Sequence, residues 1–209
     1  VSLVFEGVYQ MALVYLNGWL LTRNVNGYAE FTVEAGPYLK YGADNLLKVI
    51  ADNSLEPNSR WYTGSGIYRP VRLLVGNKVY LPQDTVRITT READEGFALL
   101  DVTAQVQSAS TVTERVTLQQ TICREGTAVL TDRQNLLLQP GESRTVSFRY
   151  CVDSPALWSP ENPNLYTSTM QVLEGEEELD REETGFGIRT LSIDAAHGVR
   201  INGQTVKLR

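Results

Sequence analysis

The sequence predicts an all-β protein built as two successive β-sandwiches. Short runs of alternating apolar and polar residues recur along its 209 residues, and this period-two spacing buries one face of a strand. Turn residues separate the runs at intervals typical of sandwiches. No segment keeps the three/four spacing of an amphipathic helix over the length of an ordinary helix, so we expect almost no helix.

The first sandwich is expected over residues 1–80. The run Leu13–Leu16 alternates as a strand does, and Asn17-Gly18 follows it. That dipeptide favours a two-residue hairpin turn, because both of its positions take positive φ. Asn26-Gly27 marks a further turn. The sandwich is expected to end at Leu81-Pro82, because proline cannot continue a central strand.

The second sandwich is expected over residues 81–190, with seven strands in about 100 residues, the size of an immunoglobulin-like domain. Three runs place apolar residues at alternate positions: Ala98, Leu100, Val102, Ala104 and Val106; Val116, Leu118 and Ile122; Val146, Phe148, Tyr150 and Val152. Residues 191–209 are too few for a domain. They hold a hairpin around Asn202-Gly203.

Composition excludes several classes of partner. The formal net charge of −6 argues against nucleic acid or an anionic membrane, and no apolar run approaches the ~20 residues that cross a bilayer. We expect a cytoplasmic protein; secretion or a periplasmic location stays open, because the sequence starts without Met inside a strand-like run. Cys123 and Cys151 would form a disulfide only if their strands pair, and two free thiols are favoured.

Most polar clusters have an ordinary structural interpretation. The dense carboxylates Glu174, Glu176, Glu177, Glu178, Asp180, Glu182 and Glu183 are expected to form a solvated hairpin that protects a sheet edge. A calcium site is the alternative, but the ordered ligand spacing is absent. His197, the single histidine, is expected at a surface or interface. Neither a metal site nor a cofactor is predicted.

Several sequence blocks follow one another in the order found in a known enzyme family. They are VYLNGWLL at Val14–Leu21 followed by Gly27-Tyr28 and Phe31, NLLKVIADN at Asn45–Asn53, SRWYTGSGIYRPV at Ser59–Val71, LWSPENPNLYT at Leu157–Thr167 with TGFGIRT at Thr184–Thr190, and GVRINGQTVKLR at Gly198–Arg209. These blocks resemble glycoside hydrolase family 2, the β-galactosidase/β-glucuronidase type.

The resemblance implies an identity for each part of the chain. Residues 1–80 would be part of a jelly-roll, galactose-binding-like sugar-binding domain that lacks its first strands. Residues 81–190 would be the immunoglobulin-like β-sandwich, and 191–209 the opening hairpin of a (β/α)₈ barrel. Trp158 would fill the interface between modules. The missing jelly-roll strands would leave an exposed edge through which the protein could form a homo-oligomer.

The same resemblance implies that this chain holds no catalytic residue. Retaining glycosidases need two carboxyl groups about 5–5.5 Å apart, which the family carries as glutamates on barrel strands, and a barrel needs about 250 residues. We therefore expect the non-catalytic N-terminal portion of a retaining β-galactosidase, which scaffolds the barrel. The alternatives are a parent β-glucuronidase or β-mannosidase, a stand-alone carbohydrate-binding module, and an adhesive immunoglobulin-like pair.

The candidate substrate-binding residues are Asp52, Asn53, Arg60 and Trp61. In some family members a jelly-roll loop enters the active site, where a carboxylate or amide contacts the sugar. Arg60 stands where one subgroup has an acidic residue, which is a departure from the pattern. Aromatic rings stack on pyranose faces and paired hydrogen bonds fix their orientation, but Asp52-Asn53 as a turn and Trp61 as a buried anchor are the alternative. Carbohydrate binding by the isolated chain is expected to be weak.

Overall fold

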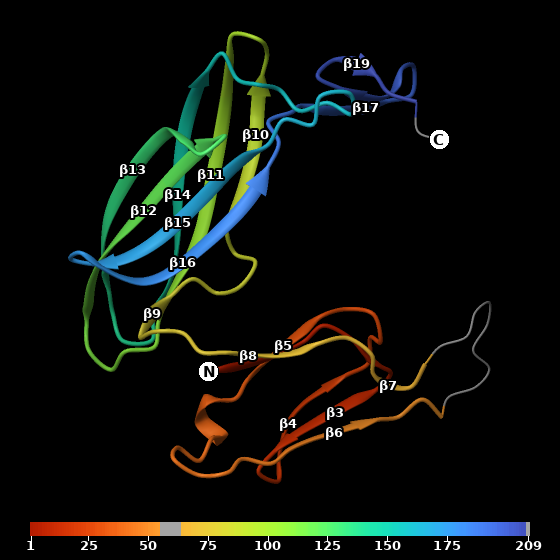
Figure 1. Ribbon diagram of the computed structural model, residues 1–209, viewed down its shortest axis with the longest axis vertical. Helices are drawn as coiled ribbons and strands as arrows, with labels where there is room; N and C mark the ends of the chain where they lie inside the picture. The colour runs from red at the N-terminus through yellow and green to blue at the C-terminus, as the bar shows by residue number, and fades with distance from the viewer. Residues whose placement is uncertain (55–63, 208–209) are drawn as a thin grey trace. The chain divides into compact units, whose positions relative to one another are not determined.

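The computed structural model describes residues 1–54 and 64–207, and its contacts divide the chain into two compact units, Val1–Gly76 and Asn77–Arg209. Both units are built around antiparallel strands (Figure 1). Within the described ranges the one helical segment is a 3₁₀ turn, η1 (Gly36–Tyr38). The predicted all-β fold is therefore confirmed.

The first unit contains two three-stranded sheets, with the orders β5-β1-β8 and β4-β3-β6, and a two-stranded pair β2-β7. The bounds are β1 (Ser2–Phe5), β2 (Val8–Tyr9), β3 (Ala12–Leu16), β4 (Trp19–Asn24), β5 (Phe31–Glu34), β6 (Leu47–Ala51), β7 (Gly66–Ile67) and β8 (Val71–Leu74). As predicted, Asn17 and Gly18 connect β3 to β4 with φ values of 52° and 89°. This is the left-handed backbone that a two-residue hairpin requires.

The core of the first unit lies between its two larger sheets. The rings of Phe5 and Phe31 stack with their centroids 4.9 Å apart. The buried residues around them are Leu3, Val8, Ala12, Val14, Leu16, Val33 and Ala35. Strands β1 and β3, which supply most of this core, are the central strands of their sheets.

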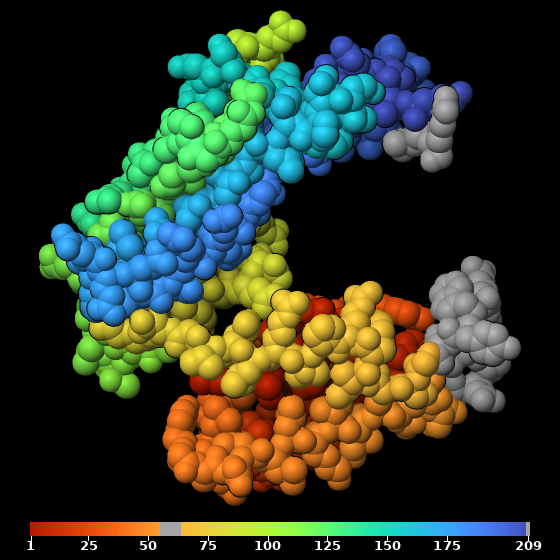
Figure 2. Space-filling view, viewed as in Figure 1, coloured from red at the N-terminus to blue at the C-terminus, as the bar shows by residue number. Residues whose placement is uncertain are grey.

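The outer strands β6 and β8 leave apolar side chains uncovered. Leu73 lies opposite Leu3 across the β1–β8 pair, so both side chains point to the same face of the sheet. Leu3 is buried in the core, whereas Leu73 is 59% exposed. Leu47 on β6 lies opposite the buried Leu16 and is also exposed. Figure 2 shows the segment that carries β8 on the surface of the first unit.

The second unit is a sandwich of seven long strands, the number that the sequence predicts. The bounds are β10 (Arg87–Ala93), β11 (Phe97–Ser108), β12 (Glu114–Arg124), β13 (Thr127–Leu138), β14 (Ser143–Asp153), β15 (Tyr166–Glu174) and β16 (Glu177–Phe186). One sheet has the order β10-β11-β14, and the other has the order β13-β12-β15-β16. The fourth strand, β13, pairs with β12, whereas in a constant-type immunoglobulin domain it pairs with the fifth.

The inward-facing residues of this sandwich match the predicted alternation. The β11 residues from Ala98 to Val106 are fully buried at every second position, and so are Val116, Leu118 and Ile122 on β12. Of the predicted set on β14 only Tyr150 is partly exposed. A polar layer interrupts the core, because buried Gln120 donates from Nε2 to Ser168 Oγ at 2.9 Å.

The division between the units falls earlier than the expected position between residues 80 and 81. Strand β9 (Val79–Tyr80) pairs with the end of β11, where Val79 lies opposite Ser108. Lys78 Nζ also forms ion pairs with Glu114 and Glu174 of the second sandwich, both at 3.0 Å. These contacts bind residues 77–80 to the second unit, whose first residue is Asn77.

A small third sheet follows the sandwich within the second unit. It consists of β17 (Leu191–Asp194), β18 (Gly198–Ile201) and β19 (Gln204–Thr205), with Asn202 and Gly203 at positive φ in the predicted hairpin turn. Asn202 Nδ2 donates to the carbonyl oxygen of Trp158 at 3.0 Å, and Trp158 N donates to Ile188 O at 2.8 Å. Trp158 thus lies between the end of the sandwich and this hairpin.

Two further findings concern the cysteines and the helices. Cys123 and Cys151 are both free thiols, on strands β12 and β14 of different sheets. None of the helices in the described ranges has the length and apolar character that would let it cross a bilayer.

Candidate functional site

The structure places two of the four predicted sugar-contact residues. Asp52 and Asn53 follow directly after β6, whereas Arg60 and Trp61 lie outside the described residues. The prediction that the four act together therefore stays a prediction. The structure defines the geometry of Asp52 and Asn53 and of the strands around them.

Asp52 forms a local turn. Its backbone N–H donates to Met11 O at 3.3 Å, and its Oδ1 accepts the backbone N–H of Ser54 at 2.9 Å. This hydrogen bond to the residue two positions ahead is typical of an Asx turn. Hydrogen bonds from the hydroxyl and the backbone of Ser54 lower the pKa of the exposed Asp52 carboxyl. Asp52 is therefore an anionic hydrogen-bond acceptor at neutral pH.

Asn53 links two chain segments that are distant in sequence. Its Nδ2 donates to the hydroxyl of Ser65 at 2.9 Å. Ser65 precedes β7, where Gly66 has a φ of 97° and lies opposite Tyr9 of β2. A side chain at position 66 would strain this backbone. Gly66 therefore allows a tight turn at this point.

A group of aromatic residues that the sequence did not single out as a site adjoins this pair. Tyr68, directly after β7, donates its hydroxyl to the carbonyl oxygen of Gly27 at 2.8 Å. The ring of Tyr28 contacts that of Tyr9, with centroids 5.3 Å apart and planes at 61°. The signal that could have identified the group is the recurrence of tyrosines next to glycines, in Gly27-Tyr28 and in Gly66-Ile67-Tyr68.

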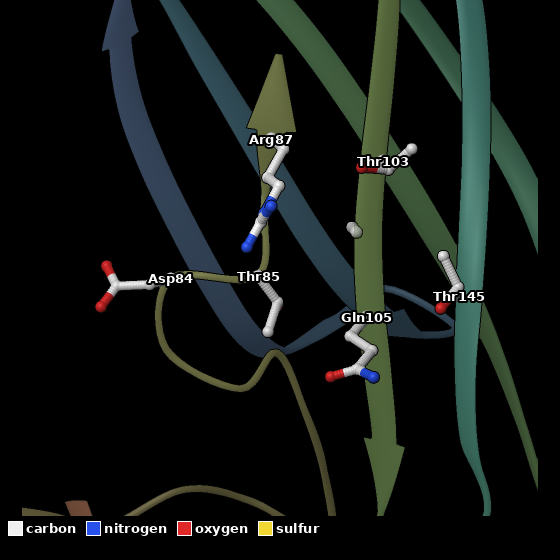
Figure 3. Close-up of a pocket in the computed structure, with 7 residues that line it drawn as sticks. Asp84, Thr85, Arg87, Thr103, Gln105 and Thr145 are labelled. Atoms are coloured by element: carbon white, nitrogen blue, oxygen red, sulfur yellow. The ribbon is translucent and has the colours of Figure 1, made fainter. Parts of the chain in front are cut away.

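A shallow hollow of about 240 Å³ lies on the outer face of the β10-β11-β14 sheet (Figure 3). Its lining is polar and comprises Asp84, Thr85, Arg87, Thr103, Ala104, Gln105 and Thr145. Figure 3 shows the Asp84 carboxylate pointing away from the other labelled side chains. Because the lining holds neither an aromatic ring nor a convergent pair of carboxylates, this hollow lacks the groups expected of a glycosidase site.

The acidic hairpin has the structural role that the sequence predicts. Glu176 and Glu177 are exposed at the turn between β15 and β16. Asp180 Oδ2 accepts the backbone N–H of Leu81 at 2.7 Å. Burial, followed by the charges of Asp84 and Asp180, raises the pKa of the Glu182 carboxyl. In the part of the chain that the structure describes, no three His, Cys, Asp or Glu side chains are grouped to hold a metal ion.

His197 is a surface residue, as predicted. Its Nδ1 lies 2.9 Å from Asp194 Oδ1 in the exposed turn between β17 and β18. Arg200 contacts the second oxygen of the same carboxylate at 2.5 Å. Asp194 therefore orders a turn, and the arrangement includes no nucleophile of the kind that a catalytic triad requires.

Comparison with known proteins identifies the family of this fold. The family model described as glycosyl hydrolases family 2 matches residues 79–189. A β-galactosidase of Bacteroides ovatus is 36% identical over 205 residues, which are 98% of this chain and 24% of that protein. A β-glucuronidase of Formosa agariphila is 27% identical over 229 residues, covering 100% of this chain and 23% of that protein.

The structural comparison leads to the same family. A glycosyl hydrolase family 2 member from Bacteroides cellulosilyticus superimposes with a TM-score of 0.90 at 31% identity, covering 97% of this chain and 28% of that one. The chain thus spans about a quarter of the length of the proteins it matches. More than half of its residues match the family model, and the chain belongs to glycosyl hydrolases family 2.

Proposed function

We propose that this chain is the non-catalytic N-terminal portion of a retaining β-galactosidase that hydrolyses terminal β-galactosides. The observation that carries the proposal is the 36% identity to the Bacteroides ovatus β-galactosidase over 98% of the chain. The identity to a putative β-glucuronidase of Formosa agariphila is 34%, and the identity to another β-glucuronidase of that organism is 27%. A parent β-glucuronidase is the second candidate, because a Bacteroides uniformis β-glucuronidase superimposes with a TM-score of 0.92.

The two units would serve as a scaffold for the catalytic barrel of the same polypeptide. The small C-terminal sheet supports this role, because Leu191 and Ile193 lie on one face of β17 and both are exposed. Val199 and Ile201 lie opposite them on β18. An uncovered apolar face on a small sheet is typical of a site of contact with protein. Contact with further protein would cover that face.

Asp52, Asn53, Arg60 and Trp61 would line one wall of the substrate pocket. The support is chemical: Asp52 is an anionic acceptor, and the amide of Asn53 is held by Ser65. A carboxylate and an amide are groups that fix the orientation of sugar hydroxyls. Cytoplasmic location and the formation of a homo-oligomer through the outer strands of the first unit also stay predictions.

Hydrolysis assays test the proposal. The purified chain is expected to leave chromogenic β-galactosides and β-glucuronides intact, because the paired carboxyl groups of a retaining site lie elsewhere. A polypeptide that joins this chain to its barrel is expected to hydrolyse the β-galactoside with at least about tenfold higher kcat/KM than the β-glucuronide, a difference of about 1.4 kcal/mol. Turnover by the chain alone, or a reversed preference, would contradict the proposal.

A further inference from the structure

Three Asn-Gly dipeptides occur in the chain, at Asn17-Gly18, Asn26-Gly27 and Asn202-Gly203. Asparagine followed by glycine is prone to spontaneous deamidation, because glycine has no side chain that would hinder attack of its backbone nitrogen on the asparagine Cγ. In a folded protein the rate of this intramolecular attack depends on where the fold holds the carboxamide. The structure holds the three carboxamides in two different ways.

The side chain of Asn17 is held at both ends by a loop that is distant in sequence. Its Nδ2 donates to Tyr38 O and to Asn45 Oδ1, both at 2.8 Å. Its Oδ1 accepts the backbone N–H of Leu46 at 3.0 Å. These three hydrogen bonds fix the carboxamide through contacts outside the turn, so it cannot rotate toward Gly18 N without breaking them.

The side chain of Asn202 is fixed in the same manner in the second unit. Its Nδ2 donates to Trp158 O at 3.0 Å, and its Oδ1 accepts the backbone N–H of Thr190 at 3.0 Å. The backbone N–H of Asn202 also donates to Thr190 O at 3.0 Å. The carboxamide therefore bridges two other segments and is not free to turn toward Gly203 N.

The exposed side chain of Asn26 is folded over the backbone of its own turn instead. Its Oδ1 accepts the N–H of Tyr28 at 2.9 Å and that of Ala29 at 3.2 Å, from the two residues that follow Gly27. An Asx turn of this kind folds the carboxamide carbon toward the peptide nitrogen of the intervening residue, here Gly27. Within residues 1–54 and 64–207, neither Asn26 Nδ2 nor Gly27 N has a hydrogen-bond partner.

The reaction that this arrangement favours is formation of a succinimide. Gly27 N loses its proton to hydroxide and attacks Asn26 Cγ, and negative charge develops on Oδ1. The N–H groups of Tyr28 and Ala29 already point at this oxygen, and donors placed at a developing oxyanion stabilise it. The bond from Cγ to Nδ2 then breaks, and the amide nitrogen takes a proton from water and leaves as ammonia. Water opens the ring to aspartate or isoaspartate.

We propose that Asn26 is a deamidation site of the first unit, where the fold promotes conversion to aspartate and isoaspartate. Asn17 and Asn202 are protected, because hydrogen bonds to distant segments hold their carboxamides. The three dipeptides have the same sequence, so their different fates follow from the fold alone. The inference does not depend on the sugar that the parent enzyme hydrolyses.

The product changes the packing around Gly27. A Cβ on Gly27 would lie 2.2 Å from Cδ2 of the Tyr9 ring, and the carbonyl oxygen of Gly27 accepts the hydroxyl of Tyr68 at 2.8 Å. Isoaspartate at position 26 lengthens the backbone directly before this glycine, and either product adds a negative charge. The modification therefore acts where Tyr9 and Tyr68 meet the backbone of Gly27.

Incubation of the purified chain at mildly alkaline pH, followed by peptide mapping with mass spectrometry, tests the proposal. Asn26 is expected to convert at least about tenfold faster than Asn17 and Asn202, a difference of about 1.4 kcal/mol in activation free energy. In urea, which removes the restraints of the fold, the three rates are expected to lie within about a factor of three of one another. The three sites are measured in one sample, so each serves as a control for the others.

A variant that releases Asn17 tests the protection. Asn45→Ala removes the acceptor of one Asn17 hydrogen bond and is expected to speed conversion of Asn17 at least about threefold. Conversion of Asn26 should stay unchanged. Asn45→Asp keeps an oxygen at this position and is the matched control, in which Asn17 should remain slow. Amide NMR spectra of each variant show whether the first unit is folded.

Several outcomes would overturn the proposal. Equal conversion of the three sites in the folded chain would show that the fold does not distinguish them. Faster conversion of Asn17 or Asn202, or conversion of Asn26 in urea alone, would show that the turn at Asn26 protects its carboxamide. An unchanged rate at Asn17 in folded Asn45→Ala would show that this hydrogen bond does not restrain it. None of these results affects the hydrolysis assays, so the two proposals fail separately.

Discussion

The two units differ in how completely their inward-facing side chains are covered. In the second unit, Leu118 on β12 is 0% exposed and the alternating residues of β11 are equally buried. In the first unit, Leu73 on β8 faces the same way as buried Leu3 and is largely exposed. Alternating apolar residues are therefore fully buried in the second unit, whereas in the first unit those of the outer strand β8 stay exposed to solvent.

The outer strands explain this difference. In the second unit β16 carries several acidic residues, and β13 has a polar stretch at residues 131–135, which is how natural sheets protect their edges. In the first unit two of the outer strands read LKVIA for β6 and VRLL for β8, with one basic residue in each. Exposed apolar residues on an outer strand are the kind of surface that natural sheets usually avoid or cover.

The largest effect is expected from truncating the closed core. Leu118→Ala removes buried methyl groups where the surrounding sheets cannot collapse, and should lower the free energy of unfolding by about 2–5 kcal/mol. Leu73→Ala removes the same atoms from an exposed site and should change the free energy of unfolding by less than about 0.5 kcal/mol. Urea denaturation, followed separately in each unit by NMR, measures both. Similar losses of unfolding free energy in the two variants would show that Leu73 is covered as completely as Leu118.

Amide hydrogen exchange should sharpen the contrast between the units. Strand β11 lies inside its sheet between β10 and β14, whereas β8 is an outer strand. Hydrogen-bonded amides of β8 are therefore expected to exchange at least about tenfold faster than those of β11, since local opening of β8 exposes less buried surface. Mass spectrometry of exchanged peptides, or NMR, reports these rates. Equal protection of the two strands would contradict the comparison.

A charge on the uncovered strand tests whether it mediates self-association. We expect concentrated solutions of the chain to contain oligomers paired through the first unit, and Leu73→Lys to shift them to monomers, because a desolvated lysine opposes edge pairing. The matched control is Val129→Lys, which places the same charge on an exposed apolar position of β13. Sedimentation velocity distinguishes the states. Oligomers that persist in Leu73→Lys and disappear in Val129→Lys would place the contact on the second unit.

Local features of the fold were predictable from sequence because short-range chemistry determines them. Asn17-Gly18 is a hairpin turn because both residues take positive φ, and the burial of alternate β11 residues follows from strand periodicity. The pairing of β13 with β12, and of Val79 with Ser108, depends on non-local contacts that periodicity does not encode. The division between the units at Gly76 and Asn77 depends on contacts of this kind.

The candidate site was predictable only in part. Asp52 and Asn53 were predicted as sugar contacts from a resemblance in one continuous block, and the structure gives only their local hydrogen bonds. The proximity of Tyr9, Tyr28 and Tyr68 escaped sequence reasoning because the three residues lie on separate segments. Only the packing of Tyr9 against Gly27 reveals their proximity. Spatial groupings of this kind require coordinates.

The smallest expected effect concerns Glu182, a partly buried acid on the charged outer strand of the closed sandwich. Burial raises the pKa of its carboxyl, and the negative charges of Asp84 and Asp180 raise it further. The folded state therefore binds this proton more tightly than the unfolded state does. Its contribution to stability is present below the ordinary glutamate pKa and is lost as the pH rises through the raised pKa.

Glu182→Gln should remove this pH dependence while keeping an oxygen that can accept the backbone N–H of Val86. We expect the variant to be more stable than the unmodified chain at neutral pH, by less than about 1 kcal/mol because solvent screens a partly exposed group. The difference should vanish in acid, where both side chains are neutral. Glu183→Gln, at the exposed neighbouring position, is the control. Thermal unfolding from pH 4 to 8 measures the difference, and a variant that is less stable at neutral pH would show that the charge of Glu182 stabilises this edge.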